Sequence, residues 1–264
     1  MDIPIFDSLS HPTLNGEWTK KDKGLSFDDF EIQLSKDLAY GSVACGLPNI
    51  GDYNHLDFYA YVTKIKTKKI VIPVAALTNT NNILNELKNI KDIGFNAVKI
   101  HCRYLNKECE RLFLAEVFTS CYKLGLVVFL CTYNYTNILN KLSSPTYTEV
   151  IEALKIEGRC KIIFVHGGIH ELMHYYELVR HNDHFLIDLS YTICQYHETS
   201  LILDIKYLME NLDQRLIIGS DAPEFNLKKL SNIANKISTH ISEEKKVNIF
   251  HKNLEFFFYS YMQK

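Results

Sequence analysis

The sequence predicts a (β/α)₈ barrel, the TIM-barrel fold, as a single domain over residues 1–264. Three features support this prediction. The length of 264 residues is close to the roughly 250 that are typical of the fold. Short apolar runs rich in β-branched residues alternate with longer amphipathic segments along the whole chain. Eight such apolar runs are present, which is the strand number of a closed barrel.

The eight apolar runs are expected to be parallel strands, because strands covered by helices on both faces are apolar throughout rather than alternating. They lie at residues 3–8, 42–47, 69–77, 97–104, 126–133, 161–168, 185–190 and 215–221. An open, doubly wound sheet is the alternative architecture, since it is built from the same alternation of strands and helices.

The segments between these runs carry helical patterns, most clearly at residues 81–94, 106–125 and 198–212. The first two reach a glycine at Gly94 and Gly125, where a left-handed helix C-cap is expected. No internal repeat and no Pro/Gly-rich linker interrupts the alternation, so one domain is predicted.

Composition and charge narrow the function classes. The formal net charge is −2 and the pI about 6.6, so no basic field exists to attract nucleic acid or a membrane surface. The first residues, MDIPIFDSLSHP, lack the pattern of a secretory signal, and no run of about 18 apolar residues is present. We therefore expect a cytoplasmic protein with a small-molecule substrate. The sequence leaves the oligomeric state open.

Seven cysteines are present, an odd number without framework spacing, and several lie inside apolar runs such as LVVFLCTY. This pattern favours reduced thiols over a disulfide framework. The cysteines are residues 45, 102, 109, 121, 131, 160 and 194.

Polar residues cluster at the carboxyl ends of the predicted strands. In a barrel these ends share one mouth, where active sites are built, and a titratable group buried there is costly unless it is paired or used. The sequence therefore predicts one polar site. Its members are Asp7 and His11 after the first strand, His101 and Arg103 on the fourth, Cys131 on the fifth, His166 on the sixth and Asp221 on the eighth.

Structural roles are the alternatives. Asp7 fits a turn, Asp221 fits an N-cap, and a lone cysteine such as Cys131 is often a small buried hydrophobe. His166, before Gly167-Gly168, fits a core histidine bonded to backbone.

On the predicted fourth strand, Lys99, His101 and Arg103 alternate and so share one face, whereas Val98, Ile100 and Cys102 face the helices. Three basic groups in the mouth would suit a carboxylate or phosphate of a substrate. The alternative places Arg103 in solvent and pairs Lys99 with a barrel carboxylate.

These strand ends resemble those of the amidohydrolase superfamily, in its amidohydrolase-related branch of decarboxylases and lactone hydrolases. The resemblance implies that His166 is the sixth-strand histidine and Lys99 a common fourth-strand lysine. It implies that Asp221 is the eighth-strand aspartate that binds metal or handles the proton of the attacking water. From residue 3 to about 258 the matching segments are IFDSLSHP, GFNAVKIH, LGLVVFLCTY, IIFVHGG, FLIDLS, RLIIGSDAP and NIFHKNLEFFF.

Two departures indicate a degenerate metal site. The family's His-x-His pair reads Leu9-Ser10-His11 here, and Cys131 stands at the fifth-strand histidine. Zinc accepts cysteine, histidine and aspartate, so His11, Cys131 and Asp221 are the ligands if a metal is bound. Leu9 removes one imidazole and fills its space, so no bound cofactor is expected, with zinc or another divalent metal as the alternative.

The function predicted from the resemblance is hydrolysis of an ester, lactone or amide bond in a small anionic substrate. Asp221 would be the general base, and His166 would stabilise the oxyanion or protonate the leaving group. The substrate would be held by Lys99, His101, Arg103 and Tyr133. A pseudoenzyme or binding protein that has lost the chemistry is the alternative, as is a decarboxylase of the same branch.

Overall fold

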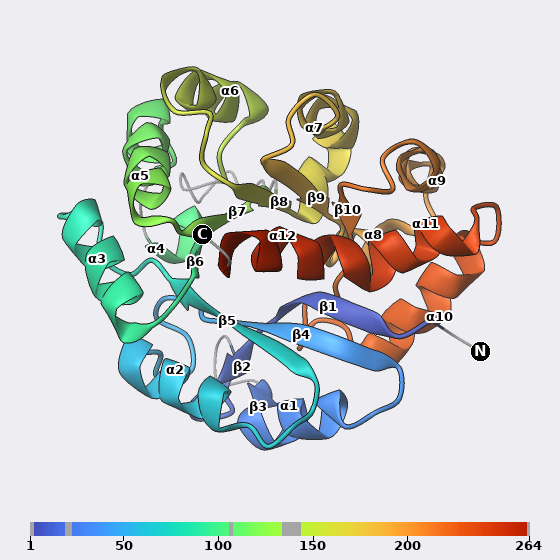
Figure 1. Cartoon of the computed structure of the whole chain (residues 1–264), viewed down its shortest axis with the longest axis horizontal. Helices are drawn as coiled ribbons and strands as arrows, with labels where there is room; N and C mark the ends of the chain where they lie inside the picture. Colours follow the sequence, from blue (N-terminus) through green and yellow to red (C-terminus); the bar gives the residue numbers. More distant parts are fainter. Residues whose placement is uncertain (1–2, 19–22, 106–107, 134–143, 263–264) are drawn as a thin grey trace.

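The computed structural model describes residues 3–18, 23–105, 108–133 and 144–262. Eight parallel strands follow one another around a single sheet in the order of the sequence, with helices outside them (Figure 1). Each predicted strand is present. The strands are β1 (Ile5–Ser10), β4 (Ala39–Cys45), β5 (Ile70–Ala76), β6 (Ala97–Ile100), β7 (Val127–Cys131), β8 (Ile162–Val165), β9 (Phe185–Asp188) and β10 (Leu216–Ile217).

The first and last strands lie against each other. Ser8 N donates to Ile218 O at 3.1 Å, and Asp221 N donates to Leu9 O at 2.9 Å. These bonds bring the two edges of the sheet together, so the predicted barrel is confirmed and the open doubly wound sheet is not formed.

Helices connect successive strands, and two of them end at the glycines that the sequence predicts as C-caps. Asn82 caps one helix through its side chain, and Gly94 and Gly125 end two helices at positive φ. The helices are α1 (Phe27–Leu34), α2 (His55–Lys64), α3 (Ile83–Ile93), α4 (Cys102–Leu105), α5 (Arg111–Leu124), α6 (Tyr147–Ile156), α7 (Leu172–Val179), α8 (Thr192–Tyr196), α9 (Leu201–Asn211), α10 (Leu227–Ile237), α11 (Glu243–Val247) and α12 (Asn253–Met262). A 3₁₀ turn (His166–Glu171), a π-helical turn (Asn248–Lys252) and a short strand pair, β2 (Pro12–Thr13) with β3 (Leu25–Ser26), complete the chain.

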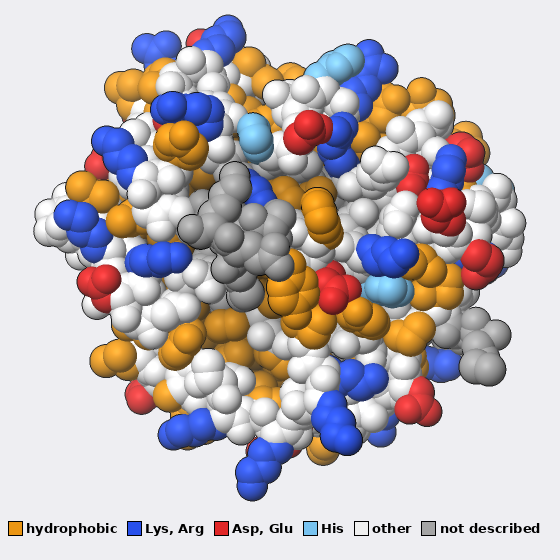
Figure 2. Space-filling view, in the orientation of Figure 1, with side chains coloured by type: hydrophobic (Ala, Val, Ile, Leu, Met, Phe, Trp, Pro, Cys, Tyr) orange, Lys and Arg blue, Asp and Glu red, His pale blue; other side chains and the backbone are white. Residues whose placement is uncertain are grey.

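The barrel interior is apolar, and α12 closes its amino-terminal end, as Figure 1 shows at its centre. Leu254, Phe257 and Phe258 of α12 join the cluster formed by inward-facing side chains such as Phe6 and Phe129. Figure 2 shows this face with acidic and basic side chains interspersed around it. With this end filled, the opposite, carboxyl end of the strands is left to form a site.

The fourth barrel strand is shorter than predicted. It ends at Ile100, because the carbonyl of His101 accepts helical bonds from Tyr104 N and Leu105 N, at 3.0 and 3.1 Å. Arg103 therefore lies on helix α4 and not on the strand. Val98 and Ile100 do pack in the outer core between strands and helices, and Cys102 joins them there.

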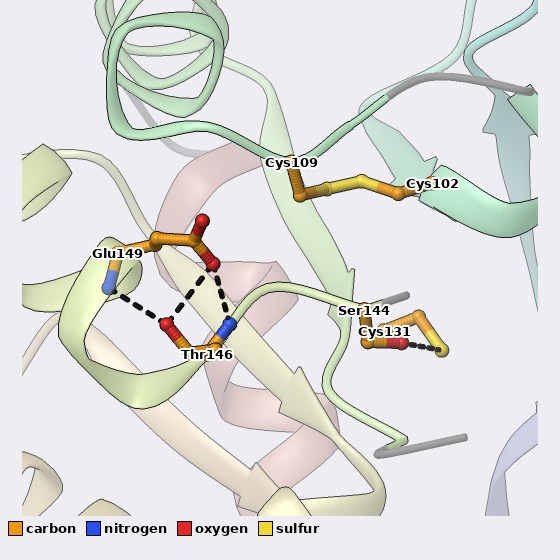
Figure 3. Close-up of a disulfide and its surroundings, with 6 residues drawn as sticks. All are labelled: Cys102, Cys109, Cys131, Ser144, Thr146 and Glu149. Atoms are coloured by element: carbon orange, nitrogen blue, oxygen red, sulfur yellow. Dashed lines mark hydrogen bonds between the residues drawn. A yellow bond between two sulfur atoms is a disulfide. The ribbon is translucent and has the colours of Figure 1, made fainter. Parts of the chain in front are cut away.

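The prediction of reduced thiols is wrong for one pair. Cys102 and Cys109 form a disulfide with a Cα–Cα distance of 5.9 Å, which ties α4 to the segment before α5 (Figure 3). The turn of chain into α4 brings the two sulfurs together, and spacing alone did not reveal it. The other five cysteines are free and buried.

The helix predicted over residues 106–125 begins at Arg111, and residues 106 and 107 lie outside the described part of the chain. In that described part, every helix is too short or too polar to span a membrane.

Candidate functional site

A cavity of about 190 Å³ opens at the carboxyl end of the strands. Drug-sized ligands occupy pockets of about 300–1,000 Å³, so this cavity suits a small molecule. Five of the seven residues that the sequence placed in one polar site line it, together with the predicted substrate-binding residues Lys99 and Tyr133, whereas Asp7 and Cys131 do not. The lining is His11, Trp18, Leu47, Lys99, His101, Arg103, Tyr104, Tyr133, His166, Tyr191, Asp221 and Glu224.

Asp221, His11 and Lys99 form a contiguous group on one wall. His11 Nε2 lies 3.4 Å from Asp221 Oδ1 and 3.0 Å from Lys99 Nζ, while His11 Nδ1 is 2.8 Å from the carbonyl oxygen of Cys45. Burial and the nearby Lys99 charge lower the pKa of His11 to about 4. At neutral pH His11 is therefore a neutral imidazole beside an amine and a carboxylate.

The pKa values of Asp221 and His166 move in opposite directions. Burial opposes ionisation of Asp221, but His166, His11 and Lys99 together hold its pKa well below the usual range. Burial also disfavours the imidazolium of His166, but the Asp221 charge and Cys131 raise its pKa above the ordinary value. The two groups thus stabilise each other as carboxylate and imidazolium.

Cys131 lies behind this pair, 1% exposed at the end of β7. Burial alone would raise the pKa of its thiol, but hydrogen bonds and charge from His101 and His166 lower that pKa well below the ordinary value. The thiol also lies 3.9 Å from Ser144 Oγ (Figure 3). Nδ1 of His101 has no hydrogen-bond partner among the described residues, although it is buried and its ring lines the cavity.

Two buried carboxylates lie behind the cavity wall and hold residues next to it. Asp7 accepts bonds from Ser220 N at 2.7 Å and from Ser220 Oγ at 2.6 Å, which fixes the residue before Asp221. Asp188, the last residue of β9, accepts bonds from Ser190, and Ser190 in turn contacts His166. Asp7 is therefore a supporting residue of the site and does not line its cavity.

Three residues of the cavity wall have left-handed backbone conformations. Their φ angles are 70° at His166, 62° at Tyr191 and 56° at Asp221. Such conformations cost roughly 1–3 kcal/mol for a residue other than glycine, and they persist where surrounding structure imposes them, as in active sites. The strain at all three positions points to the same cavity.

Aromatic rings surround the basic side chain of Arg103. Its guanidinium carbon lies 5.2 Å from the centre of the Tyr133 ring and 6.0 Å from that of Tyr104. Tyr133 packs edge-on against Tyr191 at 5.2 Å. Of the residues predicted to bind substrate, Lys99, His101, Arg103 and Tyr133 all line the cavity.

Five lining residues were not predicted. Two of them had a usable signal, because Tyr191 directly follows the polar strand end DLS and Glu224 ends the segment GSDAPE. The other three lie in loops or in α4, where no periodicity marks them. The five are Trp18, Leu47, Tyr104, Tyr191 and Glu224.

The candidate metal ligands do not fit an ion in this arrangement. Leu9 packs fully buried in the barrel interior, and the amine of Lys99 contacts the nitrogen of His11 that would face a metal. In residues 3–18, 23–105, 108–133 and 144–262, no three His, Cys, Asp or Glu side chains are grouped to hold one ion. His11, Cys131 and Asp221 therefore require rearrangement before they can bind zinc together.

Comparison with solved structures supports the fold. The chain superposes on an uncharacterized TIM-barrel protein from Bordetella bronchiseptica with a TM-score of 0.77, at 14% identity over 98% of this chain and all of that one. The 5-carboxyvanillate decarboxylase of Sphingomonas paucimobilis gives 0.68, at 10% identity over 97% and 99%. The L-hydantoinase of Arthrobacter aurescens gives 0.64, at 14% identity over 98% and 72%. No family model and no curated protein matches the sequence.

These neighbours include a hydantoinase and a decarboxylase. At 10–14% identity the likeness shows the TIM-barrel fold. The chemistry has to be argued from the cavity itself.

Proposed function

We propose that this protein is an amidohydrolase-like hydrolase that cleaves an ester, lactone or amide bond in a small anionic substrate. The observation that supports the proposal is that Asp221, in contact with His11, lines the same cavity as His166, with the pKa of Asp221 lowered and that of His166 raised. Pairs of titratable groups whose environments separate their pKa values in this way are typical of acid–base catalysis.

In the proposed reaction, water attacks the substrate carbonyl carbon. Asp221 takes a proton from that water, and His166 donates its Nε2 proton to the leaving oxygen or nitrogen. The acid product and the alcohol or amine then leave, and the proton on Asp221 passes to His166 to restore the starting state. The lowered pKa of Asp221 favours the carboxylate and the raised pKa of His166 favours the imidazolium, which are the forms that these two roles need.

A carboxylate with so low a pKa is a weak base, but the basicity of Asp221 depends on the charge of its neighbour His166. The charge of His166 is the largest influence that lowers the pKa of Asp221. When His166 gives its proton to the leaving group, that positive charge disappears and the pKa of Asp221 rises. Proton donation by one residue therefore favours proton uptake by the other.

The anionic character of the substrate is supported by the basic side chains on the wall. Lys99 is 2% exposed on β6, and Arg103 is placed by α4 among the aromatic rings. An arginine fork in a small cavity favours a planar carboxylate or a phosphate. No metal step is proposed, because the amine of Lys99 and the side chain of Leu9 stand where an ion and its ligand would be needed.

The test is a panel of esters, lactones and amides that carry a second carboxylate or phosphate, each paired with its neutral methyl ester or amide. The panel is assayed in ¹⁸O-labelled water, and aromatic carboxylates are included to test for decarboxylation. We expect ¹⁸O in the product carboxylate and at least tenfold higher kcat/KM for anionic members. Asp37→Asn, an exposed change distant from the cavity, should match the wild type.

Two outcomes would contradict the proposal. Release of CO₂ from an arenecarboxylate, with no hydrolysis in the rest of the panel, would indicate the decarboxylase. Calorimetric binding of panel members without turnover would indicate a binding protein that has lost the chemistry.

A further inference from the structure

His166 is held from behind by a buried chain of hydrogen bonds that starts at Asp188. Asp188 is fully buried at the end of β9 and accepts bonds from Ser8 Oγ at 2.5 Å and Ser190 N at 3.0 Å. Its second carboxylate oxygen accepts a bond from the Ser190 hydroxyl. Asp188 thus fixes both the backbone and the side chain of Ser190.

Ser190 presents two oxygen atoms to one nitrogen of His166. Nδ1 of His166 lies 2.8 Å from the carbonyl oxygen of Ser190 and 3.3 Å from its Oγ. A carbonyl can only accept, and the hydroxyl hydrogen of Ser190 is already donated to Asp188. Both oxygens therefore face Nδ1 as acceptors and favour a hydrogen on Nδ1, while Nε2 is the nitrogen left to contact Cys131.

We propose that Asp188 is a positioning residue which, through Ser190, keeps a proton on Nδ1 of His166 and leaves Nε2 as the nitrogen that exchanges its proton with a ligand in the cavity. The part of Nε2 in catalysis rests on the proposed function. The tautomer does not, and it is measurable in the protein without any substrate.

Replacing Asp188 by asparagine should weaken the preference for the Nδ1–H form, although the Ser190 carbonyl still accepts from Nδ1. Oδ1 can still accept from Ser8 and Ser190 N, so the new amide nitrogen occupies the position of Oδ2 and donates to Ser190 Oγ. The Ser190 hydroxyl hydrogen is then released and can be donated to Nδ1 of His166. That bond favours the tautomer with its hydrogen on Nε2.

The experiment uses the full chain with ¹⁵N-labelled histidine and long-range ¹H–¹⁵N correlation spectra at alkaline pH, where the imidazole is neutral. A His166→Asn spectrum assigns the signals. We expect His166 of the wild type in the Nδ1–H form, and a ratio of Nδ1–H to Nε2–H that is about fivefold lower in Asp188→Asn, the effect of one hydrogen bond. Ser190→Thr keeps the hydroxyl and should retain the wild-type ratio.

Asp7→Asn is the matched control, because Asp7 is an equally buried carboxylate that bonds Ser220 and not Ser190. It should leave the His166 tautomer unchanged. If Asp188→Asn does not fold, Ser190→Ala replaces it, and the ratio should fall in the same direction. A wild-type His166 in the Nε2–H form, or an unchanged ratio in the variant tested, would overturn the proposal. A protein without turnover but with these spectra would contradict only the proposed function.

Discussion

The buried carboxylate of Asp7 should leave a signature in the pH dependence of stability. Asp7 has no exposed surface, and its described partners are the donors of Ser220, Ser10, Leu9 and Gln33, with no cation among them. Burial outweighs these hydrogen bonds and raises the pKa of Asp7 to about 6. The folded protein therefore binds a proton at Asp7 at a higher pH than the unfolded chain does.

The direction and size of this change in the free energy of unfolding follow from the different proton binding of the folded and unfolded states. Between the folded pKa of about 6 and the unfolded value of 3.8, the folded state holds more protons, so Asp7 adds stability as the pH falls through 6. The whole shift corresponds to about 3 kcal/mol, of which about 2.4 kcal/mol is gained between pH 7 and pH 4. Asp7→Asn abolishes this titration and leaves the other groups in place.

The assay is urea unfolding of the wild type and Asp7→Asn at half-unit steps from pH 7 to pH 4. The free energy of unfolding of the wild type, relative to the variant, should rise by about 2.4 kcal/mol across this range. Taking the difference cancels the opposing effect of His11, whose lowered pKa makes the protein less stable as the pH falls. Parallel curves, or a relative loss of wild-type stability in acid, would refute the argument.

Three further outcomes are expected. Gly219→Ala should lower the free energy of unfolding in urea by about 2–3 kcal/mol, because the new Cβ would lie 2.9 Å from the backbone nitrogen of Leu9. The control Gly158→Ala, at an exposed position, should change it by less than about 1 kcal/mol. Equal effects of the two substitutions would contradict this packing argument. Cys109→Ser should lower stability by about 2.5 kcal/mol through the loss of a short closed loop, and reductant should affect only the wild type; a variant that is still sensitive to reductant would show that the bridge is elsewhere. Elemental analysis should find no stoichiometric zinc in protein purified without chelator, and Leu9→His with Cys131→His should raise the metal content; about one zinc per wild-type chain would contradict the assignment.

The barrel and the gathering of polar side chains around one cavity were predictable from sequence for a physical reason. Strands buried on both faces need continuous apolar runs, and parallel topology carries the carboxyl end of every run to the same mouth. His166 and Asp221 end two such runs, so their meeting did not depend on any detail of the loops.

The rest depended on contacts that no local pattern encodes. Trp18 and Tyr104 reach the cavity from a loop and from a single turn of helix, where periodicity is absent. The partners Asp7 and Ser220 are 213 positions apart in the chain, so no local pattern links them. The Cys102–Cys109 disulfide forms because β6 ends at Ile100 and α4 begins at Cys102. The sequence predicted that the strand would continue through Cys102, so it did not indicate this turn.

The central claim is that Asp221 accepts the proton of the attacking water, and Asp221→Asn tests it most directly. Asparagine keeps the size of the side chain but cannot take up that proton. On the best substrate of the panel, kcat should fall by roughly 10²–10⁴-fold. The free energy of unfolding should stay the same, and calorimetry should show that the product binds with the wild-type affinity. Unchanged turnover in Asp221→Asn, with the same stability, would contradict the account and transfer the role of base to His166.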